Sequence, residues 1–174
     1  ALVGKYLNGY DTAGTYVPPG WARWIAFVTP KYTRHTWVID GTLVTGATYS
    51  TDEIANYAVE AIGRAGTAPL FLYLAPYAPH EPATPSPLDS PTAFSAFPPW
   101  RPPSYNEVDM SDKPAWAQAL SSLTPEEQAA GDLFHKKQMR SLLAVDRLVG
   151  RVVQALQDAG RLSNAVIAFT SDNG

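Results

Sequence analysis

The sequence contains no cysteine, and this absence removes several kinds of chemistry from the chain. Disulfide bonds, zinc–thiolate sites and a thiol nucleophile are excluded within these 174 residues. Long apolar runs are also missing, because no stretch approaches the roughly 18 apolar residues that a membrane-spanning helix needs. The net charge of −3 is small and of the wrong sign for a surface that binds polyanions. We therefore expect neither a membrane nor a nucleic acid as partner.

The first residues lack the marks of a natural beginning. There is no initiator Met, no basic region and no apolar core of a signal peptide before Gly4. A hydrophobic content of 45% with 17% charged residues is typical of a globular core, at the size of one domain or part of one. Residues 1–24 are rich in Gly, Pro, Tyr and Trp, which predicts a loop pinned by aromatic rings.

The next segments predict a hairpin, a helix and a strand. His35–Ile39 and Thr42–Thr45 flank Asp-Gly, the pair that suits a type I′ turn. Ser50 and Glu53 have the spacing of a capping box, and the apolar positions behind them predict a helix that ends near Gly66. The continuous apolar run Leu70–Ala75 predicts a strand buried on both faces.

His80 follows this strand on a loop stiffened by prolines, Pro76-Tyr77-Ala78-Pro79-His80-Glu81-Pro82. A lone His is most often a surface or structural residue, but rigid loops at strand ends are where functional groups concentrate. His80 is therefore a candidate site residue.

A Pro-rich segment and a long helix come next. Residues 82–116 predict an ordered excursion, because its aromatic side chains need surface to cover. Thr124 and Pro125 are typical of a helix start, and the helix, interrupted near Gly131, should end at about Gly160. Asp146 within its apolar stretch is a candidate for a buried ion pair.

The chain closes on a predicted buried strand, Ala165–Phe169, followed by Thr-Ser-Asp-Asn-Gly. Asp172 and Asn173 offer a charged and a neutral oxygen, the ligand chemistry that Ca²⁺ and Mg²⁺ prefer. A polar turn is the alternative, because Ser, Asp, Asn and Gly all form turns. In α/β folds the carboxyl ends of strands are where ligands bind.

Several segments together resemble the sulfatase family, within the alkaline-phosphatase-like superfamily. Gly-Lys-Tyr-Leu-Asn-Gly-Tyr is most similar to the branch that includes N-acetylglucosamine-6-sulfatases and bacterial enzymes labelled arylsulfatases. The resemblance implies an α/β fold, an alkaline-phosphatase-like sandwich with a mostly parallel central sheet flanked by helices. The segments that carry it, in the family's order, are Gly4–Tyr6, Ser50–Asp52, Pro69–Pro82, Ser141–Gly160 and Phe169–Gly174.

The resemblance also implies roles for four residues. Asp172 and Asn173 match the family's second pair of metal ligands, usually to Ca²⁺, with Mg²⁺ or Mn²⁺ as alternatives. Lys5 matches the lysine that contacts the sulfate and the nucleophile, and His80 the histidine that helps to protonate the leaving oxygen. Hydrolysis of a sulfate monoester needs cations to neutralise the sulfate oxygens and a proton donor near the departing alcohol. The implied substrate is a sulfated sugar, other glycan or aryl sulfate.

Some family features are absent. Many sulfatases carry His where this chain has Leu7, followed here by Asn8. The formylglycine nucleophile, made from a Cys or Ser in a Cys/Ser-x-Pro-x-Arg motif, is expected upstream, and no such motif precedes Lys5. The family's first Asp-Asp metal pair is missing too. We therefore expect residues 1–174 to be an internal segment of a single catalytic domain that does not turn over alone.

The residues are also compatible with two other functions. A phosphodiesterase or phosphonate monoester hydrolase of the same superfamily shares the Ala-Pro-His and Asp-Asn-Gly features. A non-catalytic carbohydrate-binding segment would use its Trp and Tyr rings to stack on sugars. A secreted or periplasmic location fits the family's habit, and the oligomeric state is not indicated.

Overall fold

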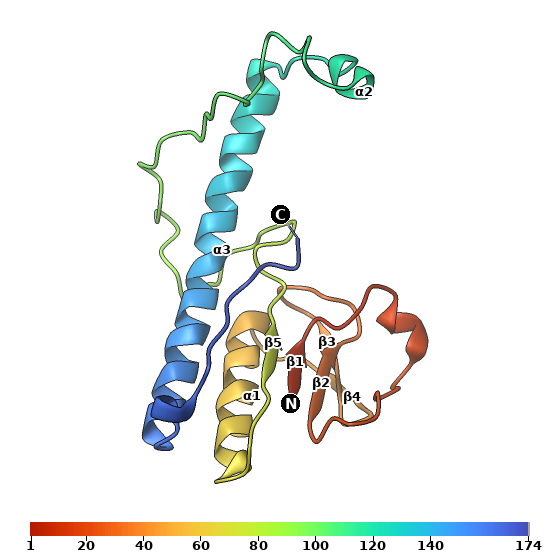
Figure 1. The fold of residues 1–174 in the computed structure, drawn as a ribbon, viewed down its shortest axis with the longest axis vertical. Coiled ribbons are helices and arrows are strands. Elements are labelled where there is room, and N and C mark those ends of the chain that lie inside the picture. The colour runs from red at the N-terminus through yellow and green to blue at the C-terminus, as the bar shows by residue number, and fades with distance from the viewer. Residues whose placement is uncertain (174) are drawn as a thin grey trace.

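The computed structural model describes residues 1–173, and a five-stranded sheet lies at the centre of that part of the chain (Figure 1). Its spatial order is β4-β3-β2-β1-β5. β1 pairs in parallel with β2 and β5, whereas β3 is antiparallel to both β2 and β4. The α/β class is confirmed, with a sheet that is mixed rather than mostly parallel. The strands are β1 (Leu2–Gly4), β2 (Trp24–Phe27), β3 (Thr36–Ile39), β4 (Thr42–Thr45) and β5 (Tyr73–Ala75).

Two helices that pack on each other, α1 and α3, cover one face of the sheet (Figure 1). α3 continues far past the sheet, and the short α2 lies near its distal end. No helix in the described residues is both long and apolar enough to span a membrane. The helices are α1 (Ser50–Ala65), α2 (Ala115–Gln118) and α3 (Pro125–Asp158), with 3₁₀ turns η1 (Tyr10–Ala13) and η2 (Leu162–Asn164).

The two faces of the sheet bury different partners, because successive side chains of a strand point to opposite sides. Val3, Ile25 and Trp37 face the helices and contact Ile54 and Leu148. The opposite face is covered by the aromatic loop between β1 and β2. Its buried cluster consists of Leu2, Tyr10, Trp24, Ala26 and Val38.

β1 and the start of β2 correct the prediction that residues 1–24 form a loop. Leu2–Gly4 is only three residues long, too short for a periodic signal, yet it is fully buried between β2 and β5. Aromatic pinning of the intervening loop is confirmed: the Tyr6 and Tyr10 rings make edge-on contacts with Trp24, at 4.8 and 5.9 Å between centroids.

The predicted hairpin is confirmed. β3 and β4 pair antiparallel with Ile39 opposite Thr42, so Asp40 and Gly41 form the two-residue turn. Both turn residues have positive φ, 48° and 88°, as a type I′ turn requires.

The capping box predicted at Ser50 and Glu53 is wrong, although the end of the helix near Gly66 is confirmed. Ser50 is the first residue of α1 and is not its N-cap. The N-cap of the helix is Tyr49, whose side chain makes no capping hydrogen bond. The Glu53 carboxylate instead accepts hydrogen bonds from the indole of Trp37 and the backbone N–H groups of Ala47 and Thr48. In the folded protein the Glu53 carboxylate therefore bonds to these donors and not to the backbone N–H at the start of the helix.

α3 begins as predicted and runs without interruption through Gly131. Thr124 and Glu127 form a reciprocal capping box at its start. At its end Gly160 has φ 66°, and the Arg161 N–H bonds back to the Leu156 carbonyl, a Schellman geometry.

The ion pair predicted for Asp146 is wrong, because that side chain is exposed. Its neighbour Arg147 instead pairs with Asp52 on α1 and Asp89 in the excursion. A rotation of about 100° per residue moves the side chain from solvent to the interface between the helices.

Two predicted buried strands differ in the structure. β5 is an edge strand, with Tyr73 exposed and the rest half-buried. Residues 165–169 have no regular structure, and Val166 and Phe169 are 99% and 79% exposed. Among residues 1–173 no strand lies beside them, so their backbone lacks the ladder that would form a strand.

The excursion over residues 82–116 is irregular up to the start of α2 and runs beside α3 (Figure 1). Its Trp100 and Trp116 rings are 67% and 72% exposed, against the prediction that they cover surface. Polar contacts attach it to α3 instead, including a two-bond pair between Arg101 and Asp132 and a bond from Arg140 to the Ala93 carbonyl.

Candidate active site

Lys5 is placed by a close approach between β1 and β5. Gly4 has φ +124°, and a Cβ there would lie 2.1 Å from the Ala75 carbonyl oxygen. Only glycine allows both the backbone angle and the contact. The Lys5 N–H then donates to the same carbonyl at 2.8 Å. The Gly-Lys pair therefore fixes the lysine at the edge where both parallel strands end.

The Lys5 ammonium approaches the C-terminal stretch at this edge. Its Nζ lies 3.9 Å from Oδ2 of Asp172, joining the two ends of the described chain. The Lys5 side chain is 25% exposed and that of Asp172 is 72% exposed. A pair at this separation with one exposed partner contributes little to stability, so its significance is that it brings two candidate site residues together.

Asp172 and Asn173 have the donor chemistry of a hard-cation site, one carboxylate and one amide oxygen. Both side chains are exposed. The Ser171 hydroxyl donates to the Asn173 backbone carbonyl, so the stretch also has the local bonding of a polar turn. Within residues 1–173 no group of three or more His, Asp or Glu side chains could hold a metal. The pair fits part of a coordination shell, and Gly174 lies outside the described residues.

His80 lies on the loop that leaves the sheet at the same edge, five residues after the end of β5. The exposed imidazole stacks on Tyr77, with centroids 4.7 Å apart and planes at 22°. Its Nδ1 is 2.8 Å from the Glu81 carbonyl. Because a carbonyl only accepts, Nδ1 carries a proton and Nε2 is the atom that can exchange a proton with a ligand.

Tyrosine hydroxyls hold the backbone around His80. Tyr32 donates to the His80 carbonyl, Tyr77 to the Glu81 carbonyl and Tyr49 to the Thr84 carbonyl. Burial raises the pKa of Tyr32 and Tyr49 far above the usual range, so both hydroxyls stay protonated and keep donating. These supports carried no signal in the sequence, because Tyr32 and Tyr49 lie well before the strand that leads to His80.

A groove of about 220 Å³ adjoins the His80 loop. Tyr77 lines it and also stacks on His80, so the groove and the imidazole share a wall. Lys31 and Pro82 lie on its rim. The structure thus brings Lys5 and Asp172 into contact and sets His80 on the same edge. Asn173 follows Asp172 without a side-chain contact to Lys5 or His80 among the described residues.

Comparisons with known proteins agree with this architecture. The sulfatase family model matches residues 1–174. Similar proteins include an arylsulfatase from Volvox carteri and an N-acetylglucosamine-6-sulfatase from Homo sapiens, each 34% identical over 99% of this chain. The chain spans 31% and 33% of their lengths, about a third. Other relatives are named as extracellular sulfatases.

The fold also resembles a solved structure, BT4656 in complex with its substrate D-glucosamine-2-N,6-O-disulfate. The TM-score is 0.62 at 17% identity, covering 94% of this chain and 44% of that one. Because the sulfatase family model matches the whole of residues 1–174, the chain belongs to the sulfatase family.

Proposed function

We propose that the protein containing this chain hydrolyses sulfate monoesters with the help of a metal ion. The observation that carries the proposal is the approach of Lys5 to Asp172 at the edge where β1 and β5 end. A cationic side chain beside an exposed carboxylate is a site where an anionic sulfate group and a divalent cation can be bound together. Family membership supports the same reaction.

Each candidate residue has a role that its surroundings support. Asp172 and Asn173 would contribute oxygens to the metal, and the bound cation would supply polarisation of the sulfate. Lys5 binds a sulfate oxygen, because its ammonium reaches the same edge. His80 gives the proton from Nε2 to the departing alcohol oxygen, with Nδ1 held by the Glu81 carbonyl.

The remaining parts of the reaction belong to the rest of the protein. We propose Ca²⁺ as the metal and a formylglycine as nucleophile, both by family membership. Residues 1–174 contain two of the metal ligands and no Cys/Ser-x-Pro-x-Arg motif. On this proposal they are an internal segment of one catalytic domain and are inactive alone.

A sulfated sugar is the proposed substrate. Relatives of this chain are named N-acetylglucosamine-6-sulfatase and extracellular sulfatase homolog, and these names support a sulfated glycan as substrate and a secreted enzyme. The groove beside His80 has a tyrosine wall, and a tyrosine ring can pack on a sugar face.

Replacing Asp172 tests the metal assignment in the full-length protein. We expect Asp172→Ala to lower bound Ca²⁺ and sulfatase activity together, the latter by a factor on the order of 10² or more, because a divalent cation needs its charged ligands. Metal content by emission spectrometry and rates on an aryl sulfate are the measurements. Asp146→Ala, an exposed acid on α3, is the control and should change neither. Unchanged metal content in Asp172→Ala would contradict the assignment.

Replacing His80 tests the proton donor. For His80→Ala the loss of kcat should grow as the leaving alcohol becomes more basic, since protonation then contributes more to the rate. Rates on a series from nitrophenyl to alkyl sulfates measure this slope. His135→Ala on α3 should leave the slope unchanged. An equal loss for every leaving group would argue against the acid role.

A further inference from the structure

The segment from His80 to Asp89 is attached to the body of the protein at a series of positions. The first attachments are to its backbone, from Tyr32 at His80, from Tyr77 at Glu81 and from Tyr49 at Thr84. The next two involve its side chains: the Ser86 hydroxyl donates to Asp52 Oδ2 at 3.1 Å, and Asp89 accepts from Arg147. The loop that carries His80 is therefore held at both ends.

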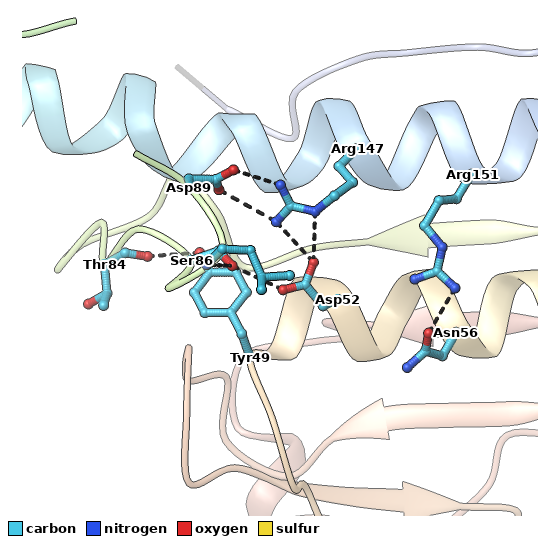
Figure 2. A network of polar contacts seen from close by, with 9 residues as sticks. Tyr49, Asp52, Asn56, Thr84, Ser86, Asp89, Arg147 and Arg151 are labelled. Atoms are coloured by element: carbon cyan, nitrogen blue, oxygen red, sulfur yellow. Dashed lines mark hydrogen bonds and ion pairs between the residues drawn. The ribbon is translucent and has the colours of Figure 1, made fainter. Parts of the chain in front are cut away.

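Arg147 is the centre of the distal attachment (Figure 2). Its Nε and one terminal nitrogen donate to Asp52 Oδ1 at 3.2 and 3.1 Å, and the other terminal nitrogen donates to Asp89 Oδ1 at 2.6 Å. One guanidinium thus joins α3, the first turn of α1 and the excursion. The Arg147 and Asp89 side chains are 31% and 9% exposed, so solvent screens this pair less than a surface pair.

The same turn of α3 forms the floor of the His80 loop. Ala144 and Val145 are buried with Ala78, two residues before His80. Tyr32 and Tyr49, whose hydroxyls hold the loop backbone, belong to the same cluster. A shift of this turn of α3 would therefore reach His80 through packing as well as through Asp89.

We propose that Arg147 is a positioning residue for His80. It fixes the distal end of residues 80–89 against α1 and α3, and so keeps the imidazole at the edge that carries Lys5. This inference rests on the proposed role of His80 as proton donor. Without Arg147 the carboxylates of Asp52 and Asp89 would lose their shared cation, and the Ser86–Asp52 hydrogen bond alone would hold the segment against their repulsion.

Arg151 provides a matched control on the same helix. One turn further along α3, its guanidinium donates to Asn56 Oδ1 of α1 at 2.8 Å and makes no contact with the excursion in the described residues (Figure 2). Arg151→Ala removes an arginine contact between α3 and α1 but leaves residues 80–89 attached. Arg147→Ala removes a contact between the same two helices and, in addition, the attachment of the excursion through Asp89.

The test is amide hydrogen exchange together with kinetics, in the full-length protein. Arg147→Ala should speed exchange at Ala83 and Asp89 by about tenfold or more, because these N–H groups bond to carbonyls within the segment. The His80 N–H, which bonds to the Tyr77 carbonyl just before the segment, should exchange faster as well. It should also lower kcat more for alkyl than for aryl sulfates. Arg147→Lys should give an intermediate effect, since an ammonium cannot bridge two carboxylates as a planar guanidinium does. Arg151→Ala should match the unsubstituted protein in both measurements.

Exchange rates in Arg147→Ala that equal those of Arg151→Ala would overturn the proposal. If Arg147→Ala does not fold, Asp89→Asn weakens the same attachment from the excursion side and should raise the same exchange rates. Loosening of the loop without any sulfatase activity in the unsubstituted protein would contradict the proposed function and leave the attachment standing. Loosening with an unchanged dependence on the leaving group would overturn the positioning role.

Discussion

Two histidines mark two contrasting regions of this molecule. His35, beside β3, is 1% exposed, and its Nε2 lies 2.9 Å from Glu53 Oε2. His80, at the edge where β1 and β5 end, is exposed, with Nε2 free of hydrogen bonds in the described residues. A buried, paired imidazole contributes to the fold, whereas an exposed imidazole held by one nitrogen can serve a ligand. The same residue type thus has opposite surroundings in the two regions.

Glu53 encloses the region around His35, which we call the closed side. The edge that carries Lys5, His80 and Asp172 is the open side. Its carboxylate accepts from Trp37, Ala47 and Thr48 and pairs with His35. Burial raises the pKa of Glu53, but the hydrogen bonds from Trp37, Thr48 and His35 outweigh it and leave the pKa below its usual range. A Cβ on Gly46 would lie 2.0 Å from His35 Nε2, so the backbone also closes on the pair. On the other side Lys5, His80 and Asp172 have no such enclosure.

The largest effect should come from the open side and appear only in catalysis. Lys5→Ala should lower kcat/KM for an aryl sulfate by about 10²- to 10³-fold, the usual effect of removing one group that stabilises transition-state charge. The free energy of unfolding should change by about 1 kcal/mol or less, because the ion pair is long and only the partly buried aliphatic stem loses packing. Kinetics and urea denaturation measure the two quantities, with Lys137→Ala as control. Unfolding of Lys5→Ala with full activity per folded molecule would contradict the division between the two sides.

The corresponding change on the closed side is Glu53→Ala. We expect a loss of about 3–5 kcal/mol in the free energy of unfolding, since several buried donors and His35 lose their shared acceptor. Urea denaturation measures it. Glu60→Ala, on the same helix with half-exposed pairs to Arg23 and Arg64, should cost less than about 1 kcal/mol. Equal losses in the two variants would show that enclosure does not distinguish Glu53.

These contrasts also show what could be predicted from the sequence. The hairpin and the ends of α3 follow from local chemistry, Asp40-Gly41 and Thr124-Pro125, and both are confirmed. The capping box at Ser50 failed because the partners of Glu53 lie up to 18 residues away in the chain. The strand predicted over 165–169 failed because a strand needs a neighbour, which local pattern does not supply. The ion pair predicted for Asp146 is formed by the next residue, Arg147, because one residue of helical rotation separates the exposed face of α3 from the interface with α1.

The candidate site was predictable only through family resemblance. Nothing local to Lys5 or Asp172 indicates that they meet, 167 residues apart, because the parallel pairing of β1 and β5 creates the edge. The physical reason for glycine before the lysine, its positive φ and its contact with Ala75, likewise becomes visible only in the folded chain.

Gly4 lies where the two regions meet, and its substitution should affect both stability and catalysis. Gly4→Ala should cost about 3 kcal/mol, from strain at φ +124° and the clash with the Ala75 carbonyl. Activity should also fall, because relieving the clash would displace the end of β1 and move Lys5 with it. Gly9→Ala has positive φ but nothing within 4 Å of its Cβ, so it should cost about 1–2 kcal/mol and keep activity. Thermal unfolding and kinetics on both variants check this, and a Gly4→Ala protein with normal activity would mean that the edge does not place the lysine.

The smallest expected effect is a pH dependence of stability that is confined to the closed side. Because the pKa of Glu53 is lowered in the folded protein, its stabilisation is complete above the usual glutamate pKa of about 4.3 and is lost as pH falls through the folded value. Protonation keeps the side chain in place, so the loss is smaller than in Glu53→Ala. The protection factors for amide exchange at Ala47 and Thr48, whose N–H groups bond to Oε1, should fall as the pH is lowered over this range. Glu53→Gln should remove the dependence, since its amide does not titrate, and a dependence that persists there would assign it to another carboxylate.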